Sequence, residues 1–322
     1  MGQQFGRAIG VRMKFQGLIR KFAVCLLLLT GAFQALAQEA SNKGSGSVRL
    51  EYQFIHTGPF NSSIGDIDIG ETDSHVFMLS GNYALNDRWT VSASLPYIKK
   101  RHQGALPHDP VLELTAFDAP DKSLIDDGNF HSDWEDLYVG VSYAAIQGDR
   151  WSVYPFVSVG VPTNDYPFYA HAAVGRNIWH VPVGAAFEFT PYFSDFSFRG
   201  DAAYVFTEKS LGVDISHWLI NLSASYYVTP SFAPNIFLSI KHGTKGLDFP
   251  DDFDLNALND EAFYYHDRTI KHNFVNGGFG FDWIMNDRYV LTGSWLTMLN
   301  PDQVNIIDFG FSLGITRRFS GE

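Results

Sequence analysis

The final regular segment of the chain, residues 307–316, alternates strictly between two kinds of side chain. One parity holds Ile307, Phe309, Phe311, Leu313 and Ile315, and the other is polar or small, with Asp308, Gly310, Ser312, Gly314 and Thr316. A repeat of two puts successive side chains on opposite faces of a β-strand, so this segment predicts a strand with one wholly apolar face. Residues 89–97, 218–226 and 275–283 alternate in the same way. These segments have about the length of a tilted membrane-crossing strand, roughly 9–11 residues.

The connections between such segments are of two kinds. Residues 86–89, 148–151 and 286–289 each place turn formers before an aromatic residue, which predicts tight hairpins with an aromatic side chain at a membrane interface. The connections on the opposite side are mostly longer, and we place them at 58–72, 99–132, 163–177 and 244–269. Short turns on one rim and long loops on the other are typical of outer-membrane barrels.

The pattern as a whole predicts an all-β fold: a transmembrane, antiparallel, up-and-down β-barrel of about twelve strands, with ten or fourteen as alternatives. An even number places both chain ends on the periplasmic side. The expected strands span residues 47–57, 73–84, 89–98, 133–147, 151–162, 178–189, 196–207, 213–228, 234–243, 270–285, 289–299 and 303–319.

A secreted β-sandwich or a lipocalin-like barrel would also alternate, but with its apolar parity turned inward to a core. In this chain the second parity carries glycine, serine and alanine mixed with isolated charges. That composition suits a crowded wet lumen better than a solvent-facing sheet, which more often carries Lys, Glu and Thr throughout. We therefore favour the membrane barrel.

The N-terminus predicts export. Lys14, Arg20 and Lys21 precede an apolar run over residues 22–33, and small residues close the segment at 35–37. This is the pattern of a secretory signal peptide. We assign residues 1–37 to the signal peptide and residues 38–322 to the barrel, in the outer membrane. Translation from Met1 or from Met13 would give the same mature chain.

Removal of the signal peptide changes both the cysteine content and the charge. The only cysteine, Cys25, leaves with it, so the mature chain can form no disulfide. Five basic residues and no acidic residue are lost, so the formal net charge moves from −12 to −17. A chain this acidic is a poor candidate for binding nucleic acid.

If the apolar parity faces lipid, nine charged side chains fall on the lumen parity. We take these as candidate lumen-lining residues: Arg49, Glu51, Glu188, Arg199, Asp201, Lys241, Asp282, Asp308 and Arg318. One interpretation is a selectivity lining for a permeating solute, and the other is a set of interior ion pairs that hold the wall together. With such side chains inside, we expect a narrow or partly plugged pore.

Other patterns do not predict chemistry. The acidic loops lack the calcium-loop pattern and the histidines match no zinc signature, so we expect no metal site and no cofactor. Residues 310–314 fit the G-x-S-x-G pattern of a nucleophile elbow, which works only on a strand-to-helix turn. Because Ser312 is expected in mid-strand, we predict that the protein is not an enzyme; a membrane-embedded hydrolase is the least favoured hypothesis.

Three segments resemble one family. Residues 83–97, which include Asn86-Asp87-Arg88-Trp89, are similar to the early hairpin of the MetA-pathway of phenol degradation family, loosely akin to FadL-type channels. Residues 134–143 and 157–165 look like two later strands of that family, with Asn164 where glycine is usual. The resemblance extends over most of residues 47–319. It implies an outer-membrane barrel that assists the movement of small, often aromatic or hydrophobic, compounds.

Two functional hypotheses follow. The first is a channel for passive transport of a small organic solute through a polar lumen. The second is a closed structural or surface-interaction barrel with acidic extracellular loops. The expected partners are outer-membrane lipid and lipopolysaccharide, the small-molecule solute, and the barrel-assembly machinery through the last strand, which ends at Arg318-Phe319 before three further residues.

Overall fold

The structure is a computed structural model, and it describes residues 43–104, 125–253 and 265–321. The predicted signal peptide and the central parts of two predicted long loops lie outside the described residues. Among the residues that are described, no helix is both long enough and apolar enough to span a bilayer.

Twelve long strands form the wall of one antiparallel sheet, ordered as they occur in the chain. They are β1 (Gly46–Ser62), β3 (Glu71–Ala84), β4 (Trp89–Gln103), β6 (Asp136–Tyr143), β8 (Trp151–Pro162), β9 (His180–Phe189), β10 (Phe196–Thr207), β11 (His217–Tyr226), β12 (Phe232–Gly243), β13 (Asn273–Asn286), β14 (Tyr289–Asp302) and β15 (Asn305–Phe319). Three short strands, β2 (Gly65–Ile67), β5 (His131–Trp134) and β7 (Ile146–Gln147), pair with β1, β4 and β8. The short helix α4 (His266–Thr269) lies in the connection before β13.

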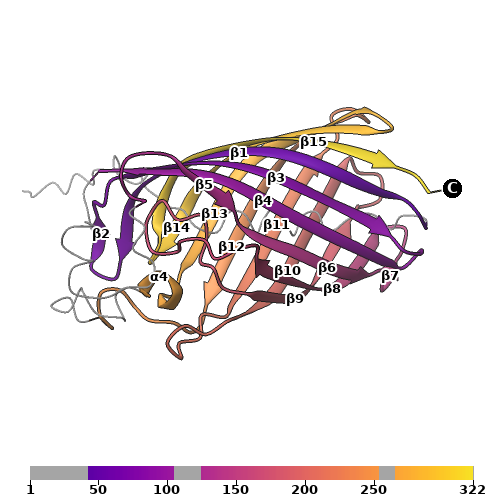
Figure 1. The fold of residues 1–322 in the computed structure, drawn as a ribbon. Coiled ribbons are helices and arrows are strands. Elements are labelled where there is room, and N and C mark those ends of the chain that lie inside the picture. Colours follow the sequence, from indigo (N-terminus) through magenta and orange to yellow (C-terminus); the bar gives the residue numbers. More distant parts are fainter. Residues whose placement is uncertain (1–42, 105–124, 254–264, 322) are drawn as a thin grey trace, which may run out of the picture.

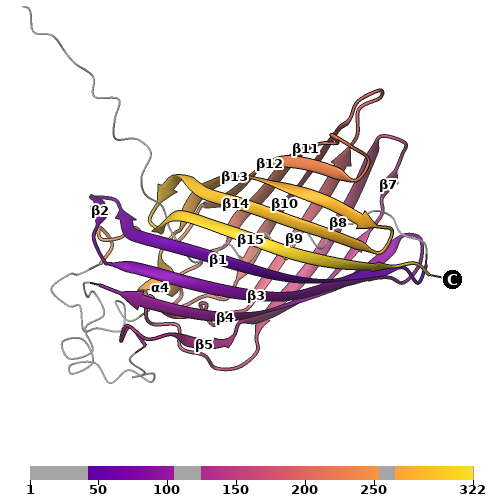
Figure 2. The same ribbon diagram turned by 90° about the horizontal axis from the view of Figure 1, so that it is seen from above.

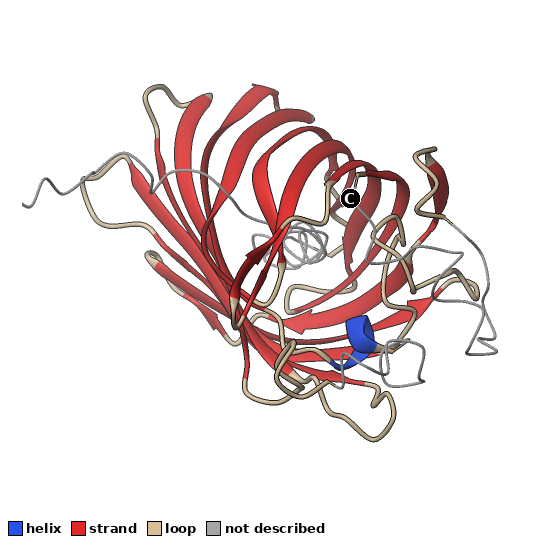
Figure 3. Cartoon of the chain, turned by 90° about the vertical axis from the view of Figure 1, so that its left-hand side faces the viewer, coloured by secondary structure: helices blue, strands red, loops and turns tan. Residues whose placement is uncertain are grey.

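The sheet closes on itself because β15 pairs with β1 along most of their length, from Gly46↔Phe319 to Phe60↔Asn305. Figures 1 and 2 show the two strands side by side, and Figure 3 shows the wall as a ring. Closure satisfies the backbone of every wall strand without leaving an edge, as a strand structure in lipid requires. The prediction of an antiparallel barrel of twelve strands is confirmed.

The two ends of the barrel differ, as predicted. Five short connections gather at one end, where the last strand also ends; we call this the turn end (Figure 1). Most of the longer connections gather at the opposite end, the loop end. At the turn end, aromatic side chains pair across strands, such as Trp89 with Tyr143 and Trp151 with Phe189, at ring-centroid distances of 4.9 and 4.2 Å. Such belts of aromatic residues are typical of a membrane interface.

The apolar parity faces outward over the middle of the wall. Leu79 on β3 is 51% exposed and Leu313 on β15 is 53% exposed, whereas the neighbouring Ser80 is buried. An exterior of this kind is stable only against lipid, since a soluble protein rarely leaves so large an apolar surface in water. Over the middle of the wall, the alternation thus predicted correctly which side chains point outward.

The strands near the loop end depart from the predicted bounds. β1 continues to Ser62 and β4 to Gln103, five residues beyond each expected end. The apolar alternation stops there, but the backbone pairing continues, with Phe60 opposite Ile67 of β2 and Gln103 opposite Glu71 of β3. β11 begins at His217 instead of residue 213, because the Asp214 carboxylate accepts a hydrogen bond from the backbone N–H of Ser216 (2.9 Å) and forms a turn.

Candidate functional site: the barrel interior

The turn-end half of the interior contains a cavity of about 270 Å³. Its lining comes from β1, β3 and β9 to β15, and serine, threonine and asparagine side chains provide much of it. Seven of the nine candidate lumen residues lie around this one cavity: Arg49, Glu51, Glu188, Arg199, Asp201, Asp282 and Arg318. The parity of the strands therefore brings together residues that are up to 269 positions apart in the sequence, from Arg49 to Arg318.

Several of these side chains are paired with each other. The Arg49 guanidinium donates to the Glu51 carboxylate, and Arg199 Nε lies 3.3 Å from Glu188 Oε1. The Asn221 amide donates to Asp201 at 3.0 Å. Pairs like these neutralise charges that the wall would otherwise carry unpaired in a confined space. The pairing agrees with the interpretation that interior ion pairs hold the wall, and Arg199 still exposes 41% of its side chain to the cavity.

Two of the nine candidates do not line this cavity. Lys241 is buried in the loop-end half of β12, opposite Leu219 on β11 and Phe274 on β13. Asp308 is exposed, because a β-bulge interrupts the pairing of β15 with β1: His56 pairs with Phe309 and Thr57 with Ile307, so Asp308 has no partner position. The bulge shifts the parity of the strand, which simple alternation does not foresee.

The loop-end half of the interior is occupied by the connection between β8 and β9, residues 163–179, which we call the interior loop. Tyr166 and Ala172 in this loop are 1% and 0% exposed. The Lys100 ammonium on the inner face of β4 donates to the carbonyl of Ala173 at 2.9 Å. The Asp126 carboxylate accepts hydrogen bonds from the backbone N–H groups of His171 and Ala172 at 2.9 and 2.7 Å. The loop is therefore fixed inside the barrel at its middle.

Further contacts fix the end of the interior loop. Arg268 of α4 donates from Nε to the carbonyl of Arg176 at 2.6 Å and from Nη2 to the carbonyl of Asn177 at 2.9 Å. Its guanidinium also lies over the ring of Phe168, 3.4 Å from the centroid. One side chain thus joins two distant connections through charge-assisted hydrogen bonds and a cation–π contact.

Tyr166 anchors the same loop to β6. Its hydroxyl donates to Asp136 Oδ1 and accepts from the backbone N–H of Asn177 at 3.1 Å. Burial raises the pKa of the Tyr166 phenol, so the hydroxyl stays protonated and keeps donating to the carboxylate.

The interior loop also approaches other parts of the wall. His171 Nδ1 lies 3.4 Å from the Asn305 amide on β15, and the His171 ring stacks near His102 of β4 with centroids 4.6 Å apart. Sequence reasoning left the placement of the long loops undecided. A usable signal was present in residues 166–173, where aromatic residues and alanines gather in a segment expected to be a long loop.

The interior also carries two apolar clusters, so the lumen is less uniformly polar than predicted. The first gathers inward-facing side chains of the β6–β11 wall: Tyr138, Tyr154, Phe156, Ala186, Ala203, Val205 and Leu219, with Ala144. The second lies on β1 and β13 to β15 and on the connection at Val304: Ile55, Phe274, Leu296, Met298, Val304, Ile306 and Ile307, with Phe237 of β12 packed against it. The interior therefore contains buried apolar packing as well as the polar and charged cavity.

Catalytic and metal chemistry finds no support among the described residues. No group of three or more potential metal ligands gathers in the part of the chain that the structure describes. Ser312 lies in the middle of β15, and its hydroxyl is 2.7 Å from that of Ser294 on β14. A hydroxyl in a flat ladder does not have the strand-to-helix turn that a nucleophile elbow needs.

Comparison with known proteins bears directly on this architecture. The family model described as "Putative MetA-pathway of phenol degradation" matches residues 111–257. The resemblance to this family is confirmed. The segment that matches the phenol-degradation family model includes the whole interior loop and wall strands β6 to β12. No curated protein matches the chain.

Solved structures agree on the fold. The COG4313 outer membrane channel from Pseudomonas putida F1 superimposes with a TM-score of 0.65 at 16% identity, covering 88% of this chain and 98% of that one. The translocator domain of the autotransporter NalP from Neisseria meningitidis gives a TM-score of 0.51 at 11% identity, covering 91% and 94%. At these identities the likeness shows that the chain has the fold of outer-membrane barrels.

Proposed function

We propose that the protein is an outer-membrane channel for the passive movement of a small organic solute, exported by residues 1–37 acting as a signal peptide. The observation that carries the proposal is the division of the interior. A cavity of about 270 Å³ lies in the turn-end half, and the interior loop, held by polar contacts to β4, β6 and α4, fills the other half. A barrel with only a structural role gains nothing from an internal cavity, since an empty space forfeits packing contacts.

The lining favours a solute with an apolar body and a polar group. Phe237 and Ile284, two half-buried residues of the cavity lining, supply apolar surface for an aromatic or aliphatic body. The cavity adds guanidinium and carboxylate groups that fix the polar end. The resemblance to a phenol-degradation family supports the same solute class, and the outer membrane channel among the similar structures supports the role of a channel. Passive passage is the simplest mechanism for a barrel in which we find no energy-coupling element among the described residues.

We expect phenyl glucoside to enter proteoliposomes at least about twice as fast as the smaller methyl glucoside, because apolar surface contributes roughly 25 cal/mol per Å² buried. Liposome swelling with the refolded mature protein measures both rates, and heat-modifiable gel migration verifies refolding. Neither probe crosses a bilayer readily, and liposomes without protein give the background.

Faster entry of methyl glucoside would contradict the preference for an apolar body. Exclusion of both probes by a refolded barrel would favour the alternative, a closed barrel that acts through its surface. Recognition of β15 by the barrel-assembly machinery stays a prediction.

A further inference from the structure

A group of charged side chains lies on the outer surface of the wall at the loop end. On β4, Ile98, Lys100 and His102 are buried on the inner face, so the intervening Lys99 and Arg101 point away from the interior. Lys99 is exposed and Arg101 is half-buried. These two cations therefore lie on the outer surface of the wall and do not line the interior.

An aromatic pair indicates where Lys99 and Arg101 lie relative to the membrane. Tyr97 precedes them on the same face of β4 and packs against Trp134 of β5, with ring centroids 5.1 Å apart and Trp134 46% exposed. Aromatic residues of this kind mark the edge of the hydrocarbon layer. At about 3.3 Å per residue, Lys99 and Arg101 lie roughly 7 and 13 Å further along the strand, less when the tilt is counted. That is the depth of lipid headgroups.

The two cations are held close together by one ring. Phe130 lies beneath both, with Lys99 Nζ 5.0 Å and the Arg101 guanidinium carbon 4.6 Å from its centroid. The Ser132 hydroxyl, which accepts a hydrogen bond from Tyr97 at 2.8 Å, is opposite Lys99 in the strand register. Two positive charges and a hydroxyl thus share one small area of the wall.

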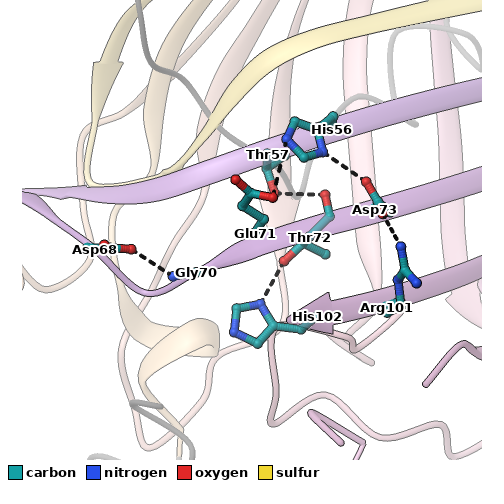
Figure 4. Close-up of polar contacts among 9 residues, drawn as sticks. All are labelled: His56, Thr57, Asp68, Gly70, Glu71, Thr72, Asp73, Arg101 and His102. Carbon is teal, nitrogen blue, oxygen red and sulfur yellow. Dashed lines mark hydrogen bonds and ion pairs between the residues drawn. The ribbon is translucent and has the colours of Figure 1, made fainter. Parts of the chain in front are cut away.

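The acids nearby leave part of this charge uncompensated. Asp73 of β3 accepts from Arg101 at 2.7 Å and lies 2.8 Å from His56, as Figure 4 shows. Glu71 is 4.0 Å from His56 and largely exposed. Lys99 makes no ion pair with any described residue. The Lys99 charge is left without an acidic partner in the described part of the chain, and a phosphate oxygen placed beside Lys99 and Arg101 would supply one.

We propose that Lys99 and Arg101 bind a phosphate group of a phosphorylated glycolipid in the outer leaflet. The inference rests on the proposed placement of the barrel, with its loop end at the cell surface. Lys99 supplies a point charge, Arg101 supplies the guanidinium N–H groups that Asp73 leaves unused, and Ser132 offers a hydroxyl. The apolar chains of the same lipid would cover the outward side chains below Tyr97 and Trp134.

Binding of diphosphoryl lipid A to the purified protein in dodecyl maltoside, measured by native mass spectrometry, tests this site. We expect Lys99→Gln to weaken binding about tenfold, the usual loss for one charge-assisted contact. Removal of the phosphates from lipid A should weaken binding to the unchanged protein by more than this factor, because the contacts to Arg101 and Ser132 are lost as well. The Lys99→Gln effect should then vanish with the dephosphorylated lipid, because the group that Lys99 contacts is absent.

Lys209→Gln is the matched control, because it removes the same charge elsewhere at the loop end. Lys209 is exposed in the connection between β10 and β11. Inorganic phosphate should displace lipid A only at far higher concentration; equal potency would show a free-anion site and overturn the lipid assignment. An equal Lys99→Gln effect on both lipids, or none on either, would overturn the phosphate contact. A non-conducting barrel that still binds lipid A in this pattern would reject the channel and retain this site.

Discussion

Replacement of Arg268 with alanine is expected to raise the open probability of single channels by at least about tenfold. Arg268 donates two hydrogen bonds to carbonyls of the interior loop, from Nε to Arg176 and from Nη2 to Asn177, and it covers the Phe168 ring. Hydrogen bonds to charged groups contribute roughly 1.5–3 kcal/mol each. Since 1.4 kcal/mol changes a population tenfold, the loss of even one such bond suffices for the expected effect.

Planar-bilayer recording measures this change directly. Lys271→Ala is the control, because Lys271 belongs to the same connection but pairs with Asp248 at 2.8 Å instead of the interior loop. If Arg268→Ala folds, as judged by heat-modifiable migration, and conducts no more often than the Lys271→Ala variant, the interior loop does not control passage.

The second large effect is expected at Arg199. Its Nε atom lies 3.3 Å from Glu188 Oε1, and 41% of its side chain is exposed in the cavity, which Asp282 also lines. Arg199→Glu replaces a positive charge with a negative one and leaves Glu188 without that partner, so the net charge of the cavity becomes more negative by two. At an effective dielectric constant of about 20, unit charges several Å apart interact by a few kcal/mol. We therefore expect the ratio of cation to anion permeability to rise about tenfold.

Reversal potentials in a salt gradient, recorded in the background of Arg268→Ala, give this ratio. Arg150→Glu makes the same change of charge at the turn end, where Arg150 lies over the ring of Tyr192 outside the cavity, and should shift the ratio much less. Equal shifts in both variants would mean that ions do not pass beside Arg199.

The wall of this barrel could be predicted because one physical constraint acts on each of its strands. A side chain must face either lipid or the interior, so apolar and polar residues alternate along each strand. The predicted strands over 151–162 and 196–207 coincide with β8 and β10. This constraint does not act on residues that lie beyond the edge of the lipid. Beyond Thr57 the apolar alternation of β1 is lost, and beyond Ile98 polar residues occupy both faces of β4. Backbone pairing, which leaves no mark in the sequence, extends both strands.

The site was predictable only in part for the same reason. Parity brought Arg49, Glu188 and Arg199 to one cavity, because a period of two fixes the face on which a side chain lies. Asp308 was misplaced, since a single bulge residue shifts the parity. The interior loop depends on contacts such as Lys100 with Ala173, 73 residues apart, and no local pattern specifies a pairing of that range.

The measurement that tests the account most directly is solute entry with the interior loop locked. Cysteines introduced at His171 and Asn305, whose side chains approach within 3.4 Å, can be joined by a short bifunctional methanethiosulfonate in a mature chain that has no other thiol. We expect the reagent to stop the entry of phenyl glucoside into proteoliposomes and reduction to restore it, with single-cysteine variants unaffected. Unchanged entry through the locked protein would contradict passage through the barrel interior under the control of this loop.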